Sequence, residues 1–119
     1  MFIKKDLLEK VGFFDEDYFF YGEDLDLCYR FKKAGYKIIY TPATKIIHYK
    51  GASSGIKTHS SHLSKATRQS KATILKESTR AMTLFYKKHY MQSYPKIVTY
   101  SVLLAIKIVQ TARLLKVKL

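Results

Sequence analysis

The 119-residue chain is poor in cysteine and in acidic residues, with one cysteine and nine Asp/Glu against 22 Lys/Arg. The single Cys28 cannot form an internal disulfide, and it lacks the partner cysteines of a structural zinc site. The sequence also lacks internal repeats, and Met1–Phe14 contains no apolar run long enough for a signal peptide. We therefore expect one domain in a reducing, cytoplasmic compartment.

The few acids are concentrated in the first half of the chain. Residues 1–56 carry nine Lys/Arg and eight Asp/Glu, whereas residues 57–119 carry 13 Lys/Arg and a single acid, Glu77. We therefore divide the chain into a balanced part, 1–56, and a basic C-terminal extension, 57–119. A segment with a net charge of +12 indicates an anionic partner such as a lipid surface, a phosphate or a nucleic acid. No RNP-like, zinc or helix-turn-helix signature supports nucleic-acid binding, so we expect no nucleic-acid partner.

The first part reads as a mixture of helix and strand. Apolar spacing and flanking glycines predict a short helix at Asp6–Val11 and a longer one over residues 22–35. Two strand-like runs follow, Tyr36–Tyr40 and Thr44–Tyr49, separated by a proline turn. The expected fold class is therefore α/β, with more helix than strand over the whole chain.

The basic extension reads as two helices, Ser64–Tyr90 and Lys96–Leu119, separated by a proline. The uninterrupted apolar run in the second helix, Ile97–Ile106, is about half of the roughly 20 residues that span a bilayer. A spanning helix is therefore not expected. The helix either lies in a membrane interface with its lysines toward the headgroups or packs on the protein. Its polar residues fall on one side of a helical wheel: Lys96, Thr99, Lys107, Gln110, Thr111 and Lys118.

Three carboxylates, Glu23, Asp24 and Asp26, follow Gly22 in the aromatic stretch FFYGEDLDLCYRF. One interpretation is purely structural, because the N–H groups and dipole of a helix N-terminus favour negative charge in the first turn. The other interpretation is catalytic. If the aromatic residues Tyr18–Tyr21 shield the carboxylates from water, one of them can act as a general base toward a hydroxyl.

The stretch GFFDEDYFFYGEDLDLCYRFKKAGYKIIYTPATKIIHYKGASS, Gly12–Ser54, resembles the C-terminal part of the catalytic domain of family 2 glycosyltransferases, especially the rhamnosyltransferase-like members. Those enzymes typically carry a GGFDE stretch, then GED-D-C-R, then AG, a proline turn, and a strand that ends in His near GxS. This chain departs from the pattern at Phe13, where a second glycine is usual. The segment ESTRAMTLFYKKHY, Glu77–Tyr90, is similar to the helix that follows in the family.

The resemblance implies a GT-A fold and sugar transfer with inversion of configuration. It implies that Asp24 is the catalytic base for the acceptor hydroxyl and that Tyr21, Gly22 and Glu23 line the acceptor pocket. It also implies that His48 is a ligand of a divalent metal, Mg or Mn, that neutralises the leaving diphosphate. Taken without the resemblance, His48 is better explained as an ordinary strand-end histidine hydrogen-bonded to the backbone.

The resemblance also implies that the nucleotide-binding half of such an enzyme comes before this segment. The only DxD triplet, Asp15–Asp17, lies where the family has GGFDE and no metal site. We therefore expect a C-terminal fragment that is inactive alone. Its partners in a complete enzyme would be a nucleoside-diphosphate sugar and a saccharide or lipid-linked acceptor.

Two alternatives to an enzyme remain open: a non-catalytic membrane-surface protein and a remnant of a split gene. A cytoplasmic protein, either free or peripheral on the inner face of the cell membrane, fits each of them. Among the other candidate residues, we expect Asp26 to cap the helix or brace its neighbours and His89 to lie on a helix face. His59 and His62 are expected to be solvated or on the acceptor side.

Overall fold

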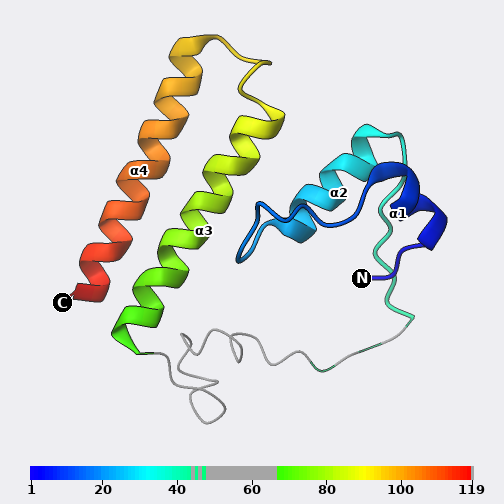
Figure 1. The fold of residues 1–119 in the computed structure, drawn as a ribbon, viewed down its shortest axis with the longest axis horizontal. Coiled ribbons are helices and arrows are strands. Elements are labelled where there is room, and N and C mark those ends of the chain that lie inside the picture. The colour runs from blue at the N-terminus through cyan, green and yellow to red at the C-terminus, as the bar shows by residue number, and fades with distance from the viewer. Residues whose placement is uncertain (44, 46, 48–66, 119) are drawn as a thin grey trace.

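The structure is a computed structural model that describes residues 1–43, 45, 47 and 67–118. Within these ranges the chain forms four α-helices (Figure 1). They are α1 (Lys5–Val11), α2 (Glu23–Lys33), α3 (Arg68–His89) and α4 (Lys96–Lys118). Each corresponds to one of the four helices predicted from the sequence, with ends that agree to within a few residues where both ends are described.

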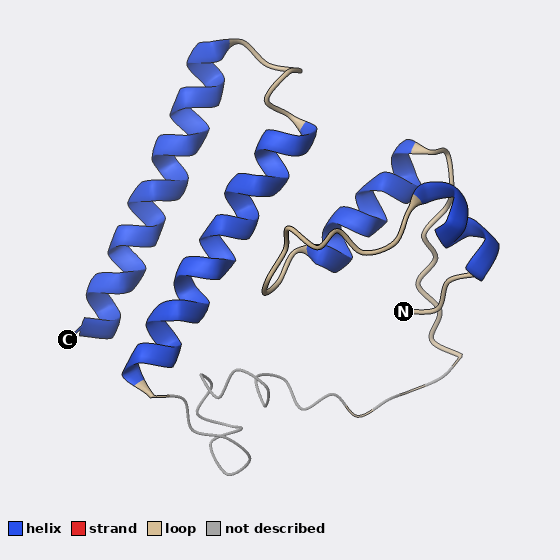
Figure 2. Cartoon of the chain, viewed as in Figure 1, coloured by secondary structure: helices blue, strands red, loops and turns tan. Residues whose placement is uncertain are grey.

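The predicted strands are not found in the described part of the chain, where every regular element is a helix (Figure 2). The prediction of a strand at Tyr36–Tyr40 is therefore wrong. Ile38, Ile39 and Tyr40 are 53%, 79% and 91% exposed, and no strand pairs with this segment among the described residues. Since a strand is stable only when its N–H and C=O groups are paired, a strand-like sequence without a partner stays irregular.

Most of the second predicted strand, Thr44–Tyr49, lies outside the described residues, and the two that are described, Lys45 and Ile47, are not in a strand. The expected α/β class is thus corrected to helical for the part that the structure describes. The expectation that helix exceeds strand is confirmed there.

Helix ends follow local chemistry. α1 ends at Gly12, whose φ of 97° lies in the left-handed region that favours glycine. At the start of α3 the Thr67 hydroxyl accepts a hydrogen bond of 3.1 Å from the Ser70 N–H, a typical N-cap. Pro95 directly precedes α4, where its missing N–H is not needed.

The most buried apolar residues of the described chain gather where α2 and the preceding loop meet α3. Tyr18, Leu27, Phe31 and Ala81 are at most 8% exposed. Nearby, the rings of Tyr29 and Phe85 meet edge to face with centroids 5.4 Å apart. This contact region places the acidic start of α2 against the C-terminal half of α3.

α3 and α4 form an antiparallel hairpin joined by a short turn (Figure 1). α2 lies on the opposite side of α3 from α4, so the layer order is α4, α3, α2 (Figure 1). Among the described residues, one helical stretch, Lys96–Val117, is long and apolar enough to cross a membrane, and only 11% of it is buried in the protein.

Candidate active site

The proposed base, Asp24, stands in the first turn of α2 with an exposed side chain. Its Oδ1 accepts a hydrogen bond of 2.7 Å from the Leu25 N–H. Among the described residues, no hydrogen bond is found to its other oxygen, Oδ2. The carboxylate therefore has one oxygen held by the helix N-terminus and one oxygen available to a hydroxyl.

Two successive left-handed residues shape the turn before α2. Tyr21 has φ of 68° and Gly22 has φ of 98°. A tyrosine in this region is uncommon and strained, and such strain persists only where the surroundings impose it. Beside this turn, one carboxylate oxygen of Glu23, Oε2, is buried without a hydrogen-bond partner among the described residues. Tyr21, Gly22, Glu23 and Asp24, which the sequence assigns to one pocket, are thus presented together at the N-terminus of α2.

Replacing Gly22 by alanine is expected to destabilise the protein, because a Cβ there would lie 3.0 Å from the Tyr18 ring and 3.2 Å from the Ala81 Cβ. Left-handed strain contributes about 1–2 kcal/mol and overpacking about 1–3 kcal/mol more. Urea unfolding followed by circular dichroism measures the loss. The matched control is Gly35→Ala, where φ is 85° but nothing lies within 4 Å of the new Cβ, so only the strain remains. Equal losses for the two variants would show that the close approach of α2 to α3 is unimportant.

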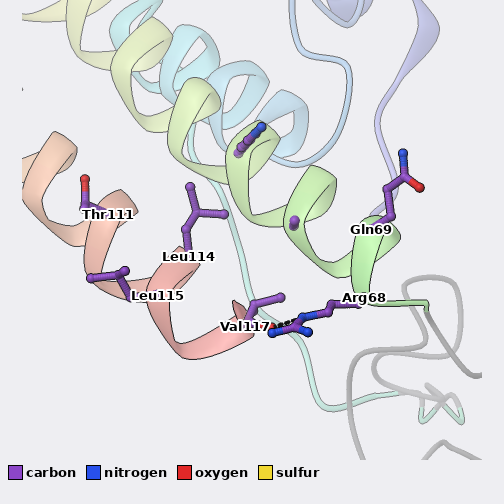
Figure 3. A pocket seen from close by; sticks show the side chains of 8 residues that line it. Arg68, Gln69, Thr111, Leu114, Leu115 and Val117 are labelled. Atoms are coloured by element: carbon purple, nitrogen blue, oxygen red, sulfur yellow. Dashed lines mark hydrogen bonds between the residues drawn. The ribbon is translucent and has the colours of Figure 1, made fainter. Parts of the chain in front are cut away.

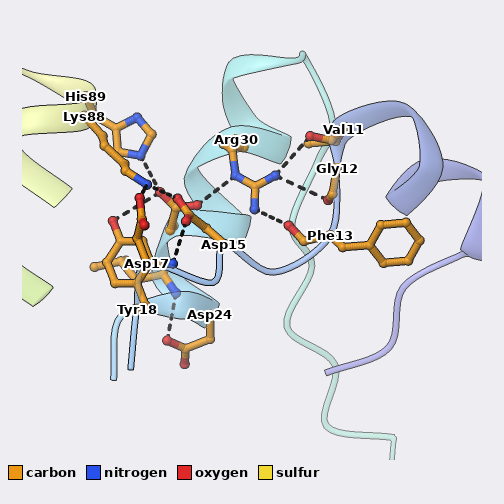
Figure 4. A network of polar contacts seen from close by, with 12 residues as sticks. Val11, Gly12, Phe13, Asp15, Asp17, Tyr18, Asp24, Arg30, Lys88 and His89 are labelled. Carbon is orange, nitrogen blue, oxygen red and sulfur yellow. Dashed lines mark hydrogen bonds and ion pairs between the residues drawn. The ribbon is translucent and has the colours of Figure 1, made fainter. Parts of the chain in front are cut away.

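The best-buried carboxylate of the cluster is Asp26, which is 1% exposed. It accepts hydrogen bonds from Arg30 Nε at 2.8 Å, from His89 Nε2 at 2.6 Å and from the Tyr18 hydroxyl at 3.3 Å (Figure 4). An ionised carboxylate only accepts, so the Nε2 of His89 carries the shared proton. Asp26 thereby joins α2, the aromatic loop and the end of α3.

Arg30 extends this network to the end of α1. Its two terminal nitrogens donate to the carbonyl oxygens of Val11, Gly12 and Phe13 at 3.0, 3.3 and 2.6 Å (Figure 4). These carbonyls lie at and just after the C-terminus of α1, where a cation is favoured. One guanidinium therefore fixes the exit of α1 against α2.

Lys88, next to His89 at the end of α3, holds the aromatic loop. Its Nζ pairs with the carboxylates of Asp15 and Asp17, at 2.7 Å for Asp17, and lies 5.6 Å from the centre of the Tyr18 ring. Burial alone would raise the pKa of Asp15, but the hydrogen bond from Lys88 brings it below its ordinary value. Burial alone would likewise lower the pKa of Lys88, but the bonds to the two carboxylates raise it.

The same surroundings act on the Tyr18 hydroxyl. Burial, and then the negative charge of Asp26, raises the pKa of Tyr18 well above its ordinary value. The hydroxyl therefore stays protonated and donates to Asp26. We call Lys88 and His89 together the α3 clamp, because Lys88 holds the aromatic loop and His89 holds α2.

The aromatic shield expected around the catalytic carboxylate is found around its neighbour instead. Tyr18 is 7% exposed and covers Asp26, whereas Phe19 and Tyr21 are 74% and 49% exposed and Asp24 faces solvent. Asp26 was expected either to brace its neighbours or to cap the helix. Its bonds to Tyr18, Arg30 and His89 confirm the bracing role. It does not cap α2, which has no side-chain hydrogen bond at its N-cap.

Sequence reasoning missed His89 and Lys88 as partners of the acidic cluster. His89 was expected on a helix face, where it does lie, but its contact with Asp26 spans 63 positions of sequence. The available signal was the pair Lys-His at the end of the helix that resembles the family's. The Asp26–Arg30 pair, at i,i+4 in a predicted helix, was within reach of a spacing argument.

The metal site proposed from the sequence is not found in the described part of the chain. No three His, Cys, Asp or Glu residues are grouped there to hold an ion. His48, His59 and His62 lie outside the described residues, as does any cleft shared by Asp24 and His48. The described residues alone therefore do not fit a metal, and we derive no step through one.

A groove of about 640 Å³ lies at the open end of the α3–α4 hairpin (Figure 3). Its described walls include Arg68 and Val117, which are joined by a hydrogen bond of 2.8 Å from Arg68 Nε to the Val117 carbonyl. This groove is at the end of α3 remote from the α3 clamp, so it takes no part in the site around Asp24. Its lining residues are Arg68, Gln69, Ala72, Lys76, Thr111, Leu114, Leu115 and Val117.

Comparison with known proteins gives one family and a small set of relatives. The family described as Glycosyl transferase family group 2 matches residues 1–115. The chain is 40% identical over 63 residues to N-acetylglucosaminyl-diphospho-decaprenol L-rhamnosyltransferase of Mycobacterium tuberculosis, in the strains CDC 1551 / Oshkosh and ATCC 25618 / H37Rv. It is 50% identical over 40 residues to Rhamnosyltransferase WbbL of Escherichia coli (strain K12).

These alignments cover 53% and 34% of this chain but only 20% and 15% of the relatives. The chain thus matches a fifth or less of the length of either relative. No solved structure matches.

Proposed function

Because the chain belongs to glycosyl transferase family group 2 and is rhamnosyltransferase-like, we propose that Asp24 is the general base of an inverting sugar transfer. The observation that carries this proposal is the exposed carboxylate at the N-terminus of α2, with Oδ1 bonded to the Leu25 N–H. A base must be able to reach the proton that it removes. The exposure of Asp24 supports this role, whereas Asp26 is buried and bound to three donors.

The reaction is a single displacement. The acceptor hydroxyl oxygen attacks the anomeric carbon of the donor sugar while its proton passes to Asp24. The bond between that carbon and the diphosphate oxygen breaks, and the nucleoside diphosphate leaves with the electron pair. Since attack comes from the face opposite the leaving group, the configuration at the anomeric carbon inverts. One base on the acceptor side is therefore sufficient.

The acceptor side of the pocket is formed in this proposal by Tyr21, Gly22 and Glu23. The left-handed turn at Tyr21 and Gly22 brings backbone to the surface beside Asp24. The buried Oε2 of Glu23 lacks a donor among the described residues, and a sugar hydroxyl is a suitable donor for it.

The proposed donor, acceptor and metal follow from the family and its relatives. The donor is a nucleoside-diphosphate sugar and the acceptor a saccharide or lipid-linked hydroxyl, in line with the decaprenol-linked substrate in the name of the Mycobacterium tuberculosis relative. A divalent metal, Mg or Mn, would neutralise the leaving diphosphate in a complete enzyme, with His48 as a ligand. Such an acceptor suits a place on the cytoplasmic side of the cell membrane, in a cell-envelope polysaccharide pathway.

Transfer assays on two proteins test this proposal. The 119-residue chain alone, incubated with a nucleoside-diphosphate sugar and a lipid-linked acceptor, is expected to give no product. A chimaera of the Mycobacterium tuberculosis relative, in which the corresponding segment is replaced by residues 1–115 of this chain, the residues that the family matches, is expected to form product with an inverted anomeric centre. Retention of configuration in the product would rule out the single-displacement mechanism.

A further inference from the structure

The face of α4 that points away from α3 is an apolar stripe. Ile97, Leu104, Ile108 and Leu115 are 76%, 62%, 60% and 56% exposed. At about 100° per residue these four positions fall within about 40° of one another on the helix. No charged residue lies between them on this face, which we call the outer stripe. An exposed apolar surface along a whole helix marks a docking surface.

The opposite face of α4, against α3, carries the polar contacts. Thr99 is 7% exposed and its hydroxyl is 3.4 Å from the Tyr86 hydroxyl. Near the middle of the hairpin, Gln110 Nε2 donates to the Thr79 Oγ1 at 2.9 Å, and Thr79 is 1% exposed. Helices that contact lipid commonly hydrogen-bond to each other and turn their apolar side chains outward, as α3 and α4 do here. The polar stripe that the sequence predicts on α4 thus contributes Thr99 and Gln110 to the interface with α3.

The charge of the hairpin identifies the kind of surface. α3 and α4 together carry 11 Lys/Arg and one acid, Glu77. Such a hairpin is attracted to anionic lipid headgroups, and an apolar stripe beside cationic residues fits the boundary between headgroups and acyl chains. We infer that the outer stripe of α4 docks the protein on an anionic membrane, with α4 lying flat in the interface.

The packing of α3 against α4 determines whether α4 lies flat on the membrane or spans it. α4, at 23 residues, is about 35 Å long and could cross a hydrocarbon core of about 30 Å. However, α3 lies antiparallel along it, and near the middle of that contact α3 carries Lys76, Glu77 and Arg80. A spanning α4 would draw these charges to the centre of the bilayer, where they are strongly disfavoured. With α4 flat, α3 stays on the aqueous side.

Flotation with vesicles of equal parts phosphatidylglycerol and phosphatidylcholine tests the docking. The intact chain is expected to float with the vesicles, less so at high salt, and more weakly with phosphatidylcholine alone. The double variant Leu104→Glu with Ile108→Glu changes two exposed positions, so the helix content should remain while the partition coefficient falls at least about tenfold. Failure of the intact chain to float, or flotation of this variant like the intact chain, would overturn the inference.

The matched control is Thr73→Glu with Met82→Glu. These positions are exposed on α3, and the substitutions change the net charge of the same hairpin by the same amount. The control should lose only the electrostatic contribution to vesicle binding, so a larger fraction of it should float than of the α4 variant. If both variants lose flotation equally, charge alone accounts for binding and the outer stripe does not dock. A dimer in solution that only the α4 variant dissociates, without flotation, would assign the stripe to a second copy instead.

Single tryptophans at Ile97, Ile108 and Leu115 measure the orientation, because the sequence has no tryptophan of its own. Quenching by lipids brominated at different depths should place all three indoles at one shallow depth. A deepest position for Ile108→Trp, with Ile97→Trp and Leu115→Trp near opposite surfaces, would show a spanning helix. This inference does not depend on the transfer chemistry, so its failure leaves the role of Asp24 unaffected.

Discussion

Substituting Asp24 by asparagine is expected to reduce sugar transfer by the chimaera that carries this segment by orders of magnitude. Asparagine keeps the size of the side chain and an oxygen that can accept from the Leu25 N–H, but it cannot take the proton of the acceptor hydroxyl. General-base catalysis contributes about 10²–10⁴-fold, so kcat should fall by this factor. The Michaelis constant for the donor should change little, because the base acts on the acceptor.

The matched control for this substitution is Asp6→Asn, which removes another exposed carboxylate from the first turn of a helix. It should leave kcat within about twofold, since a surface change away from the site has a small effect. Wild-type turnover by the Asp24→Asn enzyme would disprove the assignment of the base. A loss of the same size in both variants would point to a general effect of helix charge instead.

The substitution Asp26→Ala is expected to cause the largest loss of stability in the described part of the chain. It leaves Arg30 and His89 without their carboxylate partner, and Asp26 is 1% exposed. Breaking a buried pair by removing one partner costs about 3–5 kcal/mol. The unfolding free energy in urea, followed by circular dichroism at the helix band, measures it.

The control here is Asp17→Ala, which removes an ion pair whose carboxylate is 65% exposed. Solvent screening limits such a pair to about 1 kcal/mol or less. A double-mutant cycle with His89→Ala then isolates the contact between α2 and α3, since the two losses should be far from additive. Additive losses, or a cost for Asp26→Ala no greater than for Asp17→Ala, would mean that the α3 clamp does not hold α2.

The helices could be predicted from the sequence because their signals are local. The glycine after α1 and the proline before α4 act within one turn of the backbone. The state of Tyr36–Tyr40 could not be predicted in this way. A strand needs a partner strand, and the strand propensity of its own residues does not reveal whether a partner is present. Its residues have the right composition, yet they are irregular and exposed, and the described part of the chain offers them no partner strand.

In the candidate site, too, local sequence signals indicate some residues, whereas the partners that come from distant parts of the sequence are not indicated. Asp24 lies on a predicted helix and the resemblance assigns it a role, whereas Arg30, on the same helix, was not singled out although its i,i+4 spacing from Asp26 could have indicated it. Lys88 and His89 of α3 are 71 and 63 positions away in sequence from their partners Asp17 and Asp26. Neither hydrophobic periodicity nor the charge pattern indicates which acidic residues they contact. The resemblance assigns the role of base to Asp24 from the motif, but only the three-dimensional contacts show that Asp24 is exposed and that Asp26 is buried and bound to α3.

If α4 docks on lipid as inferred, the layer order of the helices sets the distance between the lipid and Asp24, the proposed base. α3 lies between α4 and α2, and packed helices are about 8–10 Å apart from axis to axis (Figure 1). With α4 flat in the headgroup region, the axis of α2 would stand at least about 16–20 Å above that of α4. The hairpin would then act as a spacer of fixed height, and an acceptor sugar would have to project from its lipid by a matching distance to reach Asp24. Shorter carriers would leave their hydroxyl below the site, so the thickness of two helices would itself select among acceptors.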